Sequence, residues 1–271
     1  MIIKISHKTK YNFTSIVPSL VQSLKLYPTN CKNQKILNWK ISSSKGKVVD
    51  SYIDALGHKI VNIYSNNIKG EQEILSTGKV ETKNYFGTFT GFKEKVNSSC
   101  FLRFTDLTSP GKKIIDLSKK ITKKKNEVDF CHDLNIFVSD VIKYKSNTTD
   151  NSTSAEMALE KGEGVCQDFA HILIALAKVL NLPARYVNGY LIEDRNAKDY
   201  FSHAWVEIFV KDLGWVAFDP SHKKCIDDKY VRISCGFDFI DASPIKGVKL
   251  NYLGNEDLNF KLNMEECDKH N

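Results

Sequence analysis

Short runs in which apolar and polar residues alternate fill roughly the first 95 positions of the chain. Such alternation is the pattern of a strand that buries one face. The runs are Ile2–Ile5, Lys35–Ile41, Lys47–Ile53, Lys59–Tyr64 and Gly78–Thr82, and turn-forming clusters such as Ser65–Asn67 separate them. We predict an N-terminal antiparallel β region, a sandwich or a small barrel.

The periodicity changes after Thr108–Gly111, where apolar residues begin to recur every three or four positions. This spacing predicts a helix around Ile114 and a second one from Phe130 to Val141. A short third helix is expected from Thr153, because Thr153–Glu156 has the form of a capping box. A fourth helix begins near Cys166 and ends before Pro183.

Alternation then returns and predicts the strands Arg185–Ile192, His203–Val210 and Trp215–Asp219. Helices followed by strands indicate an α+β domain. We therefore divide the chain at residues 107 and 108, into a β-sandwich-like domain over 1–107 and an α+β domain over 108–271.

Composition and charge narrow the classes of partner. The chain has 271 residues and a formal net charge of +7, which by itself is compatible with nucleic-acid binding. The densest lysines, between Lys112 and Lys125, share a predicted helix with Ile114, and this favours a solvated polar face over a binding patch. Apolar runs stay far short of the ~20 residues of a membrane span. We expect no specific nucleic-acid partner and no membrane partner.

The number and spacing of the cysteines indicate the cellular compartment. Seven of them are scattered without a repeated short spacing, so a complete disulfide framework is not expected. A reducing compartment fits this usage, and we predict a cytoplasmic protein. Met1–Ile5 alternates apolar and polar residues, which predicts a strand and not a signal peptide.

The segment GEGVCQDFAH, Gly162–His171, places two glycines before a cysteine that opens a helix. Unpaired N–H groups and the dipole at a helix N-terminus favour a thiolate, so Cys166 is a candidate nucleophile. The backbone N–H of Cys166 is a candidate donor to a developing oxyanion. The alternative is a structural cysteine, since Cys166 falls at the edge of the apolar helix face beside Phe169.

A histidine and a carboxylate follow on neighbouring predicted strands. The run SHAWVEI places His203, Trp205 and Glu207 on one strand face, and Asp219 ends the next strand, GWVAFD. A histidine near a cysteine can take up its proton, and a carboxylate can orient that histidine. Taken singly, each residue has an ordinary structural interpretation, but together they suggest a Cys–His–Asp triad.

The hairpin between these two strands supplies a geometric test. A symmetric hairpin with a four-residue loop over 211–214 would place Asp219 opposite Val206, on the wrong face for His203. We therefore predict a three- or five-residue loop, or a bulge at Gly214.

The motifs GVCQDFAH, PARYVNGYL, SHAWVEI and GWVAFDPS resemble the core of bacterial transglutaminase-like proteins. These belong to the papain-like superfamily of thiol enzymes, which includes transglutaminases, peptide N-glycanases and cysteine proteases. The N-terminal β region resembles the domain that precedes this core in the bacterial group. The resemblance implies a papain/transglutaminase-like catalytic domain over 108–271, with helices packed on an antiparallel sheet.

The resemblance also implies roles for the triad: Cys166 as the nucleophile, His203 as the general base and acid, and Asp219 as the orienting carboxylate. The C-terminal segment Cys235–Val248 resembles the end of the family's core, with one departure. Phe237 stands where a basic residue of a Gly-Arg-Asp-like motif is expected. This affects any contact made there, and not the triad.

Three further residues are candidates for the oxyanion site or the cleft. Gln167 shares with His171 and Lys178 a helix face away from the predicted core, so it borders the cleft, the solvent or the other domain. Trp205 and Tyr190 are candidates for lining an acyl-binding cleft, and the alternative is that they are core aromatic residues.

The expected chemistry is attack by Cys166 on an amide carbonyl of a peptide or protein substrate, through a thioester. Water as second substrate gives a cysteine protease or amidase, which is our main expectation, whereas a primary amine gives a transglutaminase. A non-catalytic peptide-binding module is the remaining alternative. No cofactor is expected, because nucleotide and calcium motifs are missing from the sequence. No metal is expected either, since His222 and Cys225 have no second ligand pair nearby in the sequence.

Overall fold

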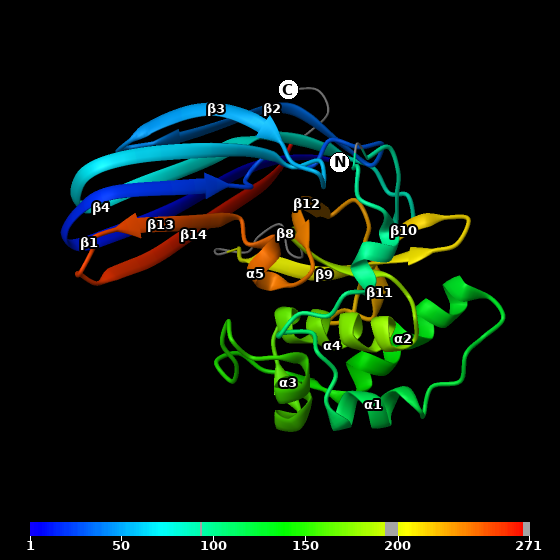
Figure 1. Cartoon of the computed structure of the whole chain (residues 1–271). Helices are drawn as coiled ribbons and strands as arrows, with labels where there is room; N and C mark the ends of the chain where they lie inside the picture. The colour runs from blue at the N-terminus through cyan, green and yellow to red at the C-terminus, as the bar shows by residue number, and fades with distance from the viewer. Residues whose placement is uncertain (93, 193–199, 268–271) are drawn as a thin grey trace.

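The chain forms three layers in the computed structural model, which describes residues 1–92, 94–192 and 200–267. In Figure 1 a strongly curved sheet lies at the top, a second sheet in the middle and a group of helices at the bottom. This is the predicted arrangement of an N-terminal β region and an α+β core.

The first sheet is antiparallel and contains two very long strands that bend back on themselves. Between Phe13 and Val17 the pairing of β1 with β4 is irregular, and nearby in β4 both Asn67 and Gly70 have positive φ angles. The polar cluster Ser65–Asn67 was expected to end a strand, but it lies in the bend of a continuous one. The strands are β1 (Ile2–Leu24), β2 (Gln34–Ser43), β3 (Lys47–Ile53), β4 (Lys59–Thr82), β13 (Ile245–Leu250) and β14 (Glu256–Cys267).

The second sheet carries His203 and Asp219 and is also antiparallel. Its order is β11-β10-β9-β8-β12, with β5 added to β10. The strands are β5 (Thr88–Phe89), β8 (Ala184–Leu191), β9 (Ser202–Val210), β10 (Gly214–Asp219), β11 (Lys224–Cys225) and β12 (Tyr230–Gly236).

The helices cover one face of this second sheet. Helix α4 is buried on nearly all sides, because the other helices pack against it opposite the sheet. The elements of this layer are α1 (Lys112–Ser118), α2 (Glu127–Val141), β6 (Lys143–Tyr144), α3 (Ala155–Lys161), β7 (Glu163–Gly164), α4 (Cys166–Val179) and α5 (Phe239–Ala242). The short helix η1 (Ser98–Leu102) instead packs Phe101 against the opposite face of the sheet, with Trp205 and Trp215.

The predicted capping box at the start of α3 is wrong in detail. Ser154, and not Thr153, is the N-cap, and its side chain accepts a hydrogen bond from the N–H of Met157. The Glu156 carboxylate instead accepts hydrogen bonds from the backbone N–H groups of Gly111, Lys113 and Ile114, at the start of α1. Glu156 therefore caps a neighbouring helix, which tertiary packing decides and a local motif cannot reveal.

Sheet membership does not follow the predicted boundary at residues 107 and 108. The C-terminal strands β13 and β14 pair with β1 in the first sheet, whereas β5 pairs with β10 in the second. Apolar residues from both sheets, including Ile3, Val80 and Tyr190, form one buried cluster where the sheets meet. The two parts of the chain therefore interlock.

The β9–β10 hairpin has the register that the triad requires. Gly214 pairs with Val210 and Phe218 pairs with Val206, so the loop has three residues, 211–213. Asp212 and Gly214, with φ angles of 68° and 83°, close this tight turn. Asp219 consequently falls on the strand face that His203 occupies, and the predicted shift is confirmed.

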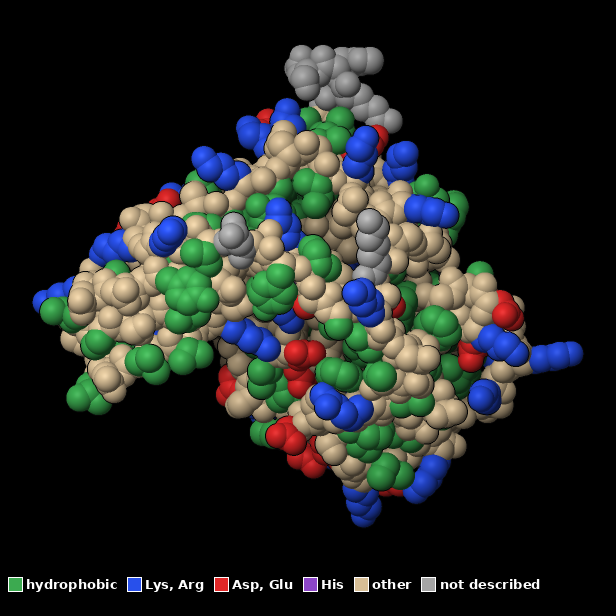
Figure 2. All heavy atoms as spheres, turned by 45° about the horizontal axis from the view of Figure 1, so that its top comes forward, with side chains coloured by type: hydrophobic (Ala, Val, Ile, Leu, Met, Phe, Trp, Pro, Cys, Tyr) green, Lys and Arg blue, Asp and Glu red, His purple; other side chains and the backbone are tan. Residues whose placement is uncertain are grey.

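Three further features relate to the predictions about nucleic acid, disulfides and membranes. On the face in Figure 2, lysine and arginine side chains are scattered and do not gather in one patch. All seven cysteines are free thiols. Among the described residues, no helix is both long and apolar enough to cross a bilayer.

Candidate active site

Cys166 is the first residue of α4, so its backbone N–H has no acceptor within the helix. The preceding segment is held tightly: Gly162 ends α3 with a φ of 69°, and Gly164 lies against the side chain of Asp168. A Cβ atom at residue 164 would come within 2.7 Å of Asp168 Cβ. The two glycines therefore allow the chain to turn sharply into the helix that presents Cys166.

Asp168 fixes this turn from inside the helix. Its Oδ2 accepts hydrogen bonds from the N–H of Val165 at 2.8 Å and from Thr149 Oγ1 at 2.6 Å. Burial raises the pKa of Asp168, and these hydrogen bonds only partly oppose the rise. Among the described hydrogen bonds, none joins Asp168 to Cys166, His203 or Asp219. Its bonds to Val165 and Thr149 instead stabilise the turn that leads into α4.

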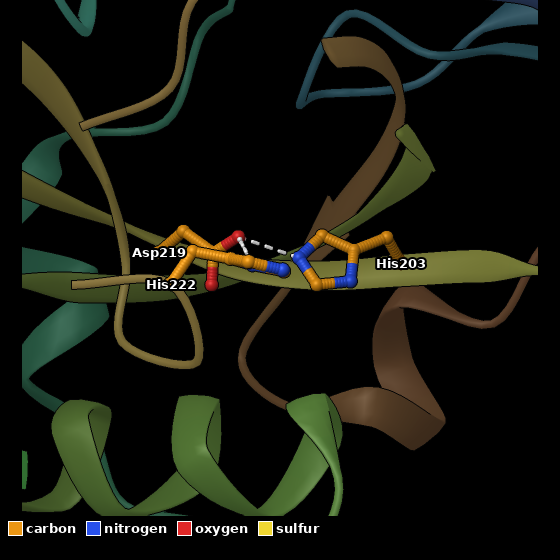
Figure 3. A group of neighbouring side chains, drawn as sticks. All are labelled: His203, Asp219 and His222. Atoms are coloured by element: carbon orange, nitrogen blue, oxygen red, sulfur yellow. Dashed lines mark hydrogen bonds and ion pairs between the residues drawn. The ribbon is translucent and has the colours of Figure 1, made fainter. Parts of the chain in front are cut away.

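His203, at the start of β9, connects the other two members of the predicted triad. Its Nε2 lies 2.6 Å from Oδ2 of Asp219, as Figure 3 shows. Its interaction with the side chain of Cys166 is one of the causes that raise its pKa, so the two side chains are neighbours. Because Nε2 faces Asp219, the imidazole can address the thiol with Nδ1. The tertiary structure thus brings together Cys166, His203 and Asp219 from one helix and two strands.

The electrostatics of the three groups favour a charged imidazole. Burial would lower the pKa of His203, but hydrogen bonds to Asp219 and Cys166, and the charges of those groups, raise it from 6.5 to about 10. Burial would raise the pKa of Asp219, yet its hydrogen bonds and charge interactions with His203 and His222 hold it well below its usual range. At neutral pH the site therefore contains an imidazolium between a buried carboxylate and the thiol group.

Sequence reasoning missed the other groups around Asp219. Its Oδ2 also lies 2.7 Å from His222 Nδ1 and 2.8 Å from the hydroxyl of Tyr230, and its Oδ1 accepts from Ser221. His222 and Ser221 stand in the turn directly after Asp219, so the local motif DPSH was a usable signal. Tyr230 comes from β12 and has no such signal, because only sheet packing brings it there.

The three candidate cleft residues lie in different surroundings. Gln167 is half-buried in the first turn of α4, next to Cys166. Trp205 is fully buried, with its ring stacked at 6.3 Å from that of His203, and Tyr190 is 1% exposed and hydrogen-bonded to His7. The expectation that Trp205 and Tyr190 line a cleft is therefore wrong for this structure. Trp205 packs beneath His203, and Tyr190 packs against the first sheet.

The helix face that Gln167 shares with two other polar residues is covered by other elements of the chain. His171 and Lys178, which share that face, are buried under other elements of the chain. His171 Nε2 accepts from the N–H of Phe239, and Lys178 donates to the carbonyl oxygen of Arg103. Contact with the other domain, one of the expected alternatives, therefore holds for Lys178, whereas the contact of His171 with α5 was not expected.

Phe237 stands where a basic residue is expected, but two cations from elsewhere in the chain lie beside its ring. The guanidinium carbon of Arg103 lies 4.1 Å from the Phe237 ring centre, and the ammonium of Lys178 lies 6.0 Å from it. These distances fit cation–π contacts. Cations from the C-cap of η1 and from α4 therefore lie beside the residue that follows β12, where the resemblance leads one to expect a cation.

Among the described residues, one cluster of side chains has the composition of a possible metal site. One ligand atom each of His203, Asp219 and His222 lies within 4.8 Å of the others. The same atoms already form hydrogen bonds of 2.6 and 2.7 Å with one another, so the grouping is explained without an ion. Cys225 does not join it, since its Sγ approaches His132 at 3.9 Å.

Replacing Asp219 by asparagine tests the orienting role. An amide keeps the shape of the side chain but loses the charge that stabilises the His203 cation, so we expect Cys166 to react with iodoacetamide about 10²- to 10⁴-fold more slowly. The rate is measured at a pH of about 6, where an ordinary thiol is almost wholly protonated. Asp116→Asn, at an exposed position on α1, is the control. An unchanged rate in Asp219→Asn would assign the orienting role to another residue.

Comparison with known proteins agrees with this architecture. Residues 115–220 match the family model of the transglutaminase-like superfamily, and residues 3–81 match that of the bacterial transglutaminase-like N-terminal region. An uncharacterized protein of Mycobacterium leprae is 24% identical over 258 residues, which cover 90% of this chain and 92% of that protein. An uncharacterized protein of Mycobacterium tuberculosis is 34% identical over 115 residues, covering 39% of this chain and 37% of that protein.

A solved structure shares the fold over the whole chain. It is that of "a Putative Cysteine Protease from Cytophaga hutchinsonii", with a TM-score of 0.78, 22% identity, and coverage of 99% of this chain and 91% of that chain. The two family models lie on the two parts of the chain that the resemblance predicted. The chain therefore belongs to the transglutaminase-like superfamily, with the bacterial transglutaminase-like N-terminal region preceding the core.

Proposed function

We propose that the protein is a thiol enzyme that cleaves amide bonds of peptide or protein substrates through a thioester on Cys166. The observation that carries this proposal is the position of His203, which is hydrogen-bonded to buried Asp219 and interacts with Cys166 at the N-terminus of α4. A histidine that bridges a thiol at a helix N-terminus and a buried carboxylate is the arrangement that activates a nucleophilic cysteine.

The first step forms the thioester. The Cys166 thiolate attacks the amide carbonyl carbon, and the N–H of Cys166 is available to the developing oxyanion. His203 then gives its Nδ1 proton to the leaving nitrogen, so the C–N bond breaks and an amine or ammonia departs. Asp219 holds the imidazole through Nε2 during this transfer.

The second step decides between a hydrolase and a transferase. Neutral His203 can take a proton from water, which then attacks the thioester, releases a carboxylic acid and regenerates the Cys166–His203 pair. A primary amine in place of water would give a new amide and make the protein a transglutaminase. We favour hydrolysis, in line with the name given to the structurally similar Cytophaga protein.

The proposal is tested by alkylation of Cys166 with iodoacetamide from pH ~4 to ~9, read by peptide mass spectrometry. We expect reactivity that persists well below ~8.5, the pKa of a free thiol, and that falls in His203→Ala. Exposed Cys100 in the same molecule is the internal reference for an ordinary thiol. If Cys166 follows Cys100 at every pH, the protein is better described as a peptide-binding module.

A positive result justifies a search for turnover. Peptide libraries are incubated with and without a primary amine, and the products are identified by mass spectrometry. Cleaved or deamidated peptides support the hydrolase, whereas amine-linked products would replace it with the transglutaminase. Each product must disappear in Cys166→Ala.

A further inference from the structure

The carboxylate of Asp219 serves two imidazole rings. His203 Nε2 and His222 Nδ1 lie 2.6 and 2.7 Å from the same oxygen, Oδ2, and the two ring centres are 5.2 Å apart at an angle of 62°. Figure 3 shows a ring nitrogen of each histidine directed at that oxygen. A triad needs only one of these imidazoles, so the second requires an explanation.

The backbone holds His222 in this position. Asp219 pairs with Lys224 across a tight turn, in which the N–H of His222 donates to the carbonyl oxygen of Asp219. Lys223 has a φ of 56°, a left-handed conformation that closes the turn. The contact between His222 and Asp219 is therefore built into the β10–β11 connection and does not depend on a freely rotating surface side chain.

The side chains of His203 and His222 differ in solvent exposure, which indicates that they have different roles at Asp219. The Asp219 side chain is fully buried, that of His203 is 10% exposed and that of His222 is 32% exposed. His222 thus lies on the solvent side of the carboxylate, where a water molecule would otherwise compete for Oδ2. Tyr230 occupies the inner side of the same oxygen.

We propose that His222 is a positioning residue, whose Nδ1–H donates to Oδ2 of Asp219 and so holds the carboxylate in the orientation that His203 requires. The inference rests on the proposed function, because the reaction of Cys166 is the process that this orientation serves. His222 itself does not touch the thiol in this scheme; it acts through Asp219 and His203.

The test compares two substitutions at the same position. His222→Ala removes the donor, and we expect alkylation of Cys166 at a pH of about 6 to slow by about tenfold. His222→Asn places an amide N–H close to the former Nδ1, and we expect it to restore the rate to within about threefold of the wild type. His132→Ala, at an exposed histidine on α2, is the matched control.

A second readout observes His203 directly. In the ¹H–¹⁵N spectrum of histidine-labelled protein, the hydrogen-bonded Nε2 proton of His203 should be visible in the wild type and His222→Asn, and lost or broadened in His222→Ala. Thermal unfolding of each variant is recorded to show that the compared proteins are folded.

The outcomes separate this inference from the proposed function. A wild-type alkylation rate and His203 signal in His222→Ala overturn the positioning role, as does an equal loss in His222→Asn. If Cys166 in the wild type is no more reactive than in His203→Ala, the proposed function fails. The His203 signal still tests the contact with His222 in that case.

Discussion

Cys166→Ala is expected to abolish covalent labelling at position 166 and all turnover, a loss of at least about 10³-fold, while the protein stays folded. The nucleophile is the only member of the triad whose atom enters the thioester, so no neighbouring group can replace it. The side chain is half-buried in the first turn of α4, and alanine is the best helix former. The free energy of unfolding should therefore change by no more than about 1 kcal/mol.

The measurement pairs product detection with thermal unfolding. Cys100→Ala is the control, because it removes another free thiol at an exposed position outside the site. Product formation that survives in Cys166→Ala would remove Cys166 from the mechanism. A collapse of stability would instead identify Cys166 as a core residue, which was the alternative that the sequence left open.

Glu207→Ala is expected to destabilise the protein by about 3–5 kcal/mol. Glu207 is fully buried between two buried arginines: Arg185 Nε lies 2.6 Å from its Oε2, and Arg232 Nε lies 2.7 Å from its Oε1. Removing the carboxylate leaves two cations next to each other in the interior, and Glu94, which pairs with Arg185, compensates only part of this charge. The cost is therefore much larger than for a surface ion pair.

Chemical denaturation measures this loss, with Glu265→Ala as control. Glu265 pairs with Lys4 at 3.3 Å, but both side chains are mostly exposed, so its removal should cost less than about 1 kcal/mol. Equal effects of the two substitutions would contradict the importance of the buried network.

The same network predicts how stability depends on pH. Burial would raise the pKa of Glu207, but Arg232 and Arg185 lower it from 4.5 to about 2. A carboxyl group with a lowered pKa stabilises the folded state above its unfolded pKa, and this stabilisation is lost as the pH falls. The free energy of unfolding should decrease from a pH of about 4.5 toward 2, and this decrease should be smaller in Glu207→Gln.

The network also connects the two parts of the chain near the site. Arg232 on β12 donates to Thr29 Oγ1, and its backbone N–H donates to Gln34, both from the N-terminal part of the chain. Through Glu207 the same arginine contacts β9, the strand that carries His203 near its start. Loss of Glu207 is therefore expected to loosen the packing between the sheets as well as the strand that carries the triad histidine.

Several features of this protein were determined by local sequence alone. Alternating and three- to four-residue periodicities located parts of many strands and most helices, because apolar residues at these spacings gather on one face of an element. The glycines before Cys166 marked a turn into a helix, and the requirement that Asp219 share a strand face with His203 predicted the shifted register of the β9–β10 hairpin. These inferences succeeded because they depend on residues that are close neighbours in the chain or in one hairpin.

Tertiary structure alone decided the rest. Glu156 caps a neighbouring helix, Trp205 and Tyr190 are buried beneath the site instead of lining it, and β13 and β14 return to pair with β1. Tyr230 reaches Asp219 from β12, which is separated from β10 in the sheet by β8 and β9, and its ring lies 5.5 Å from that of Trp205 on β9. Each of these contacts joins segments that are distant in the chain, and periodicity describes only which face of an element is buried, not which element covers it.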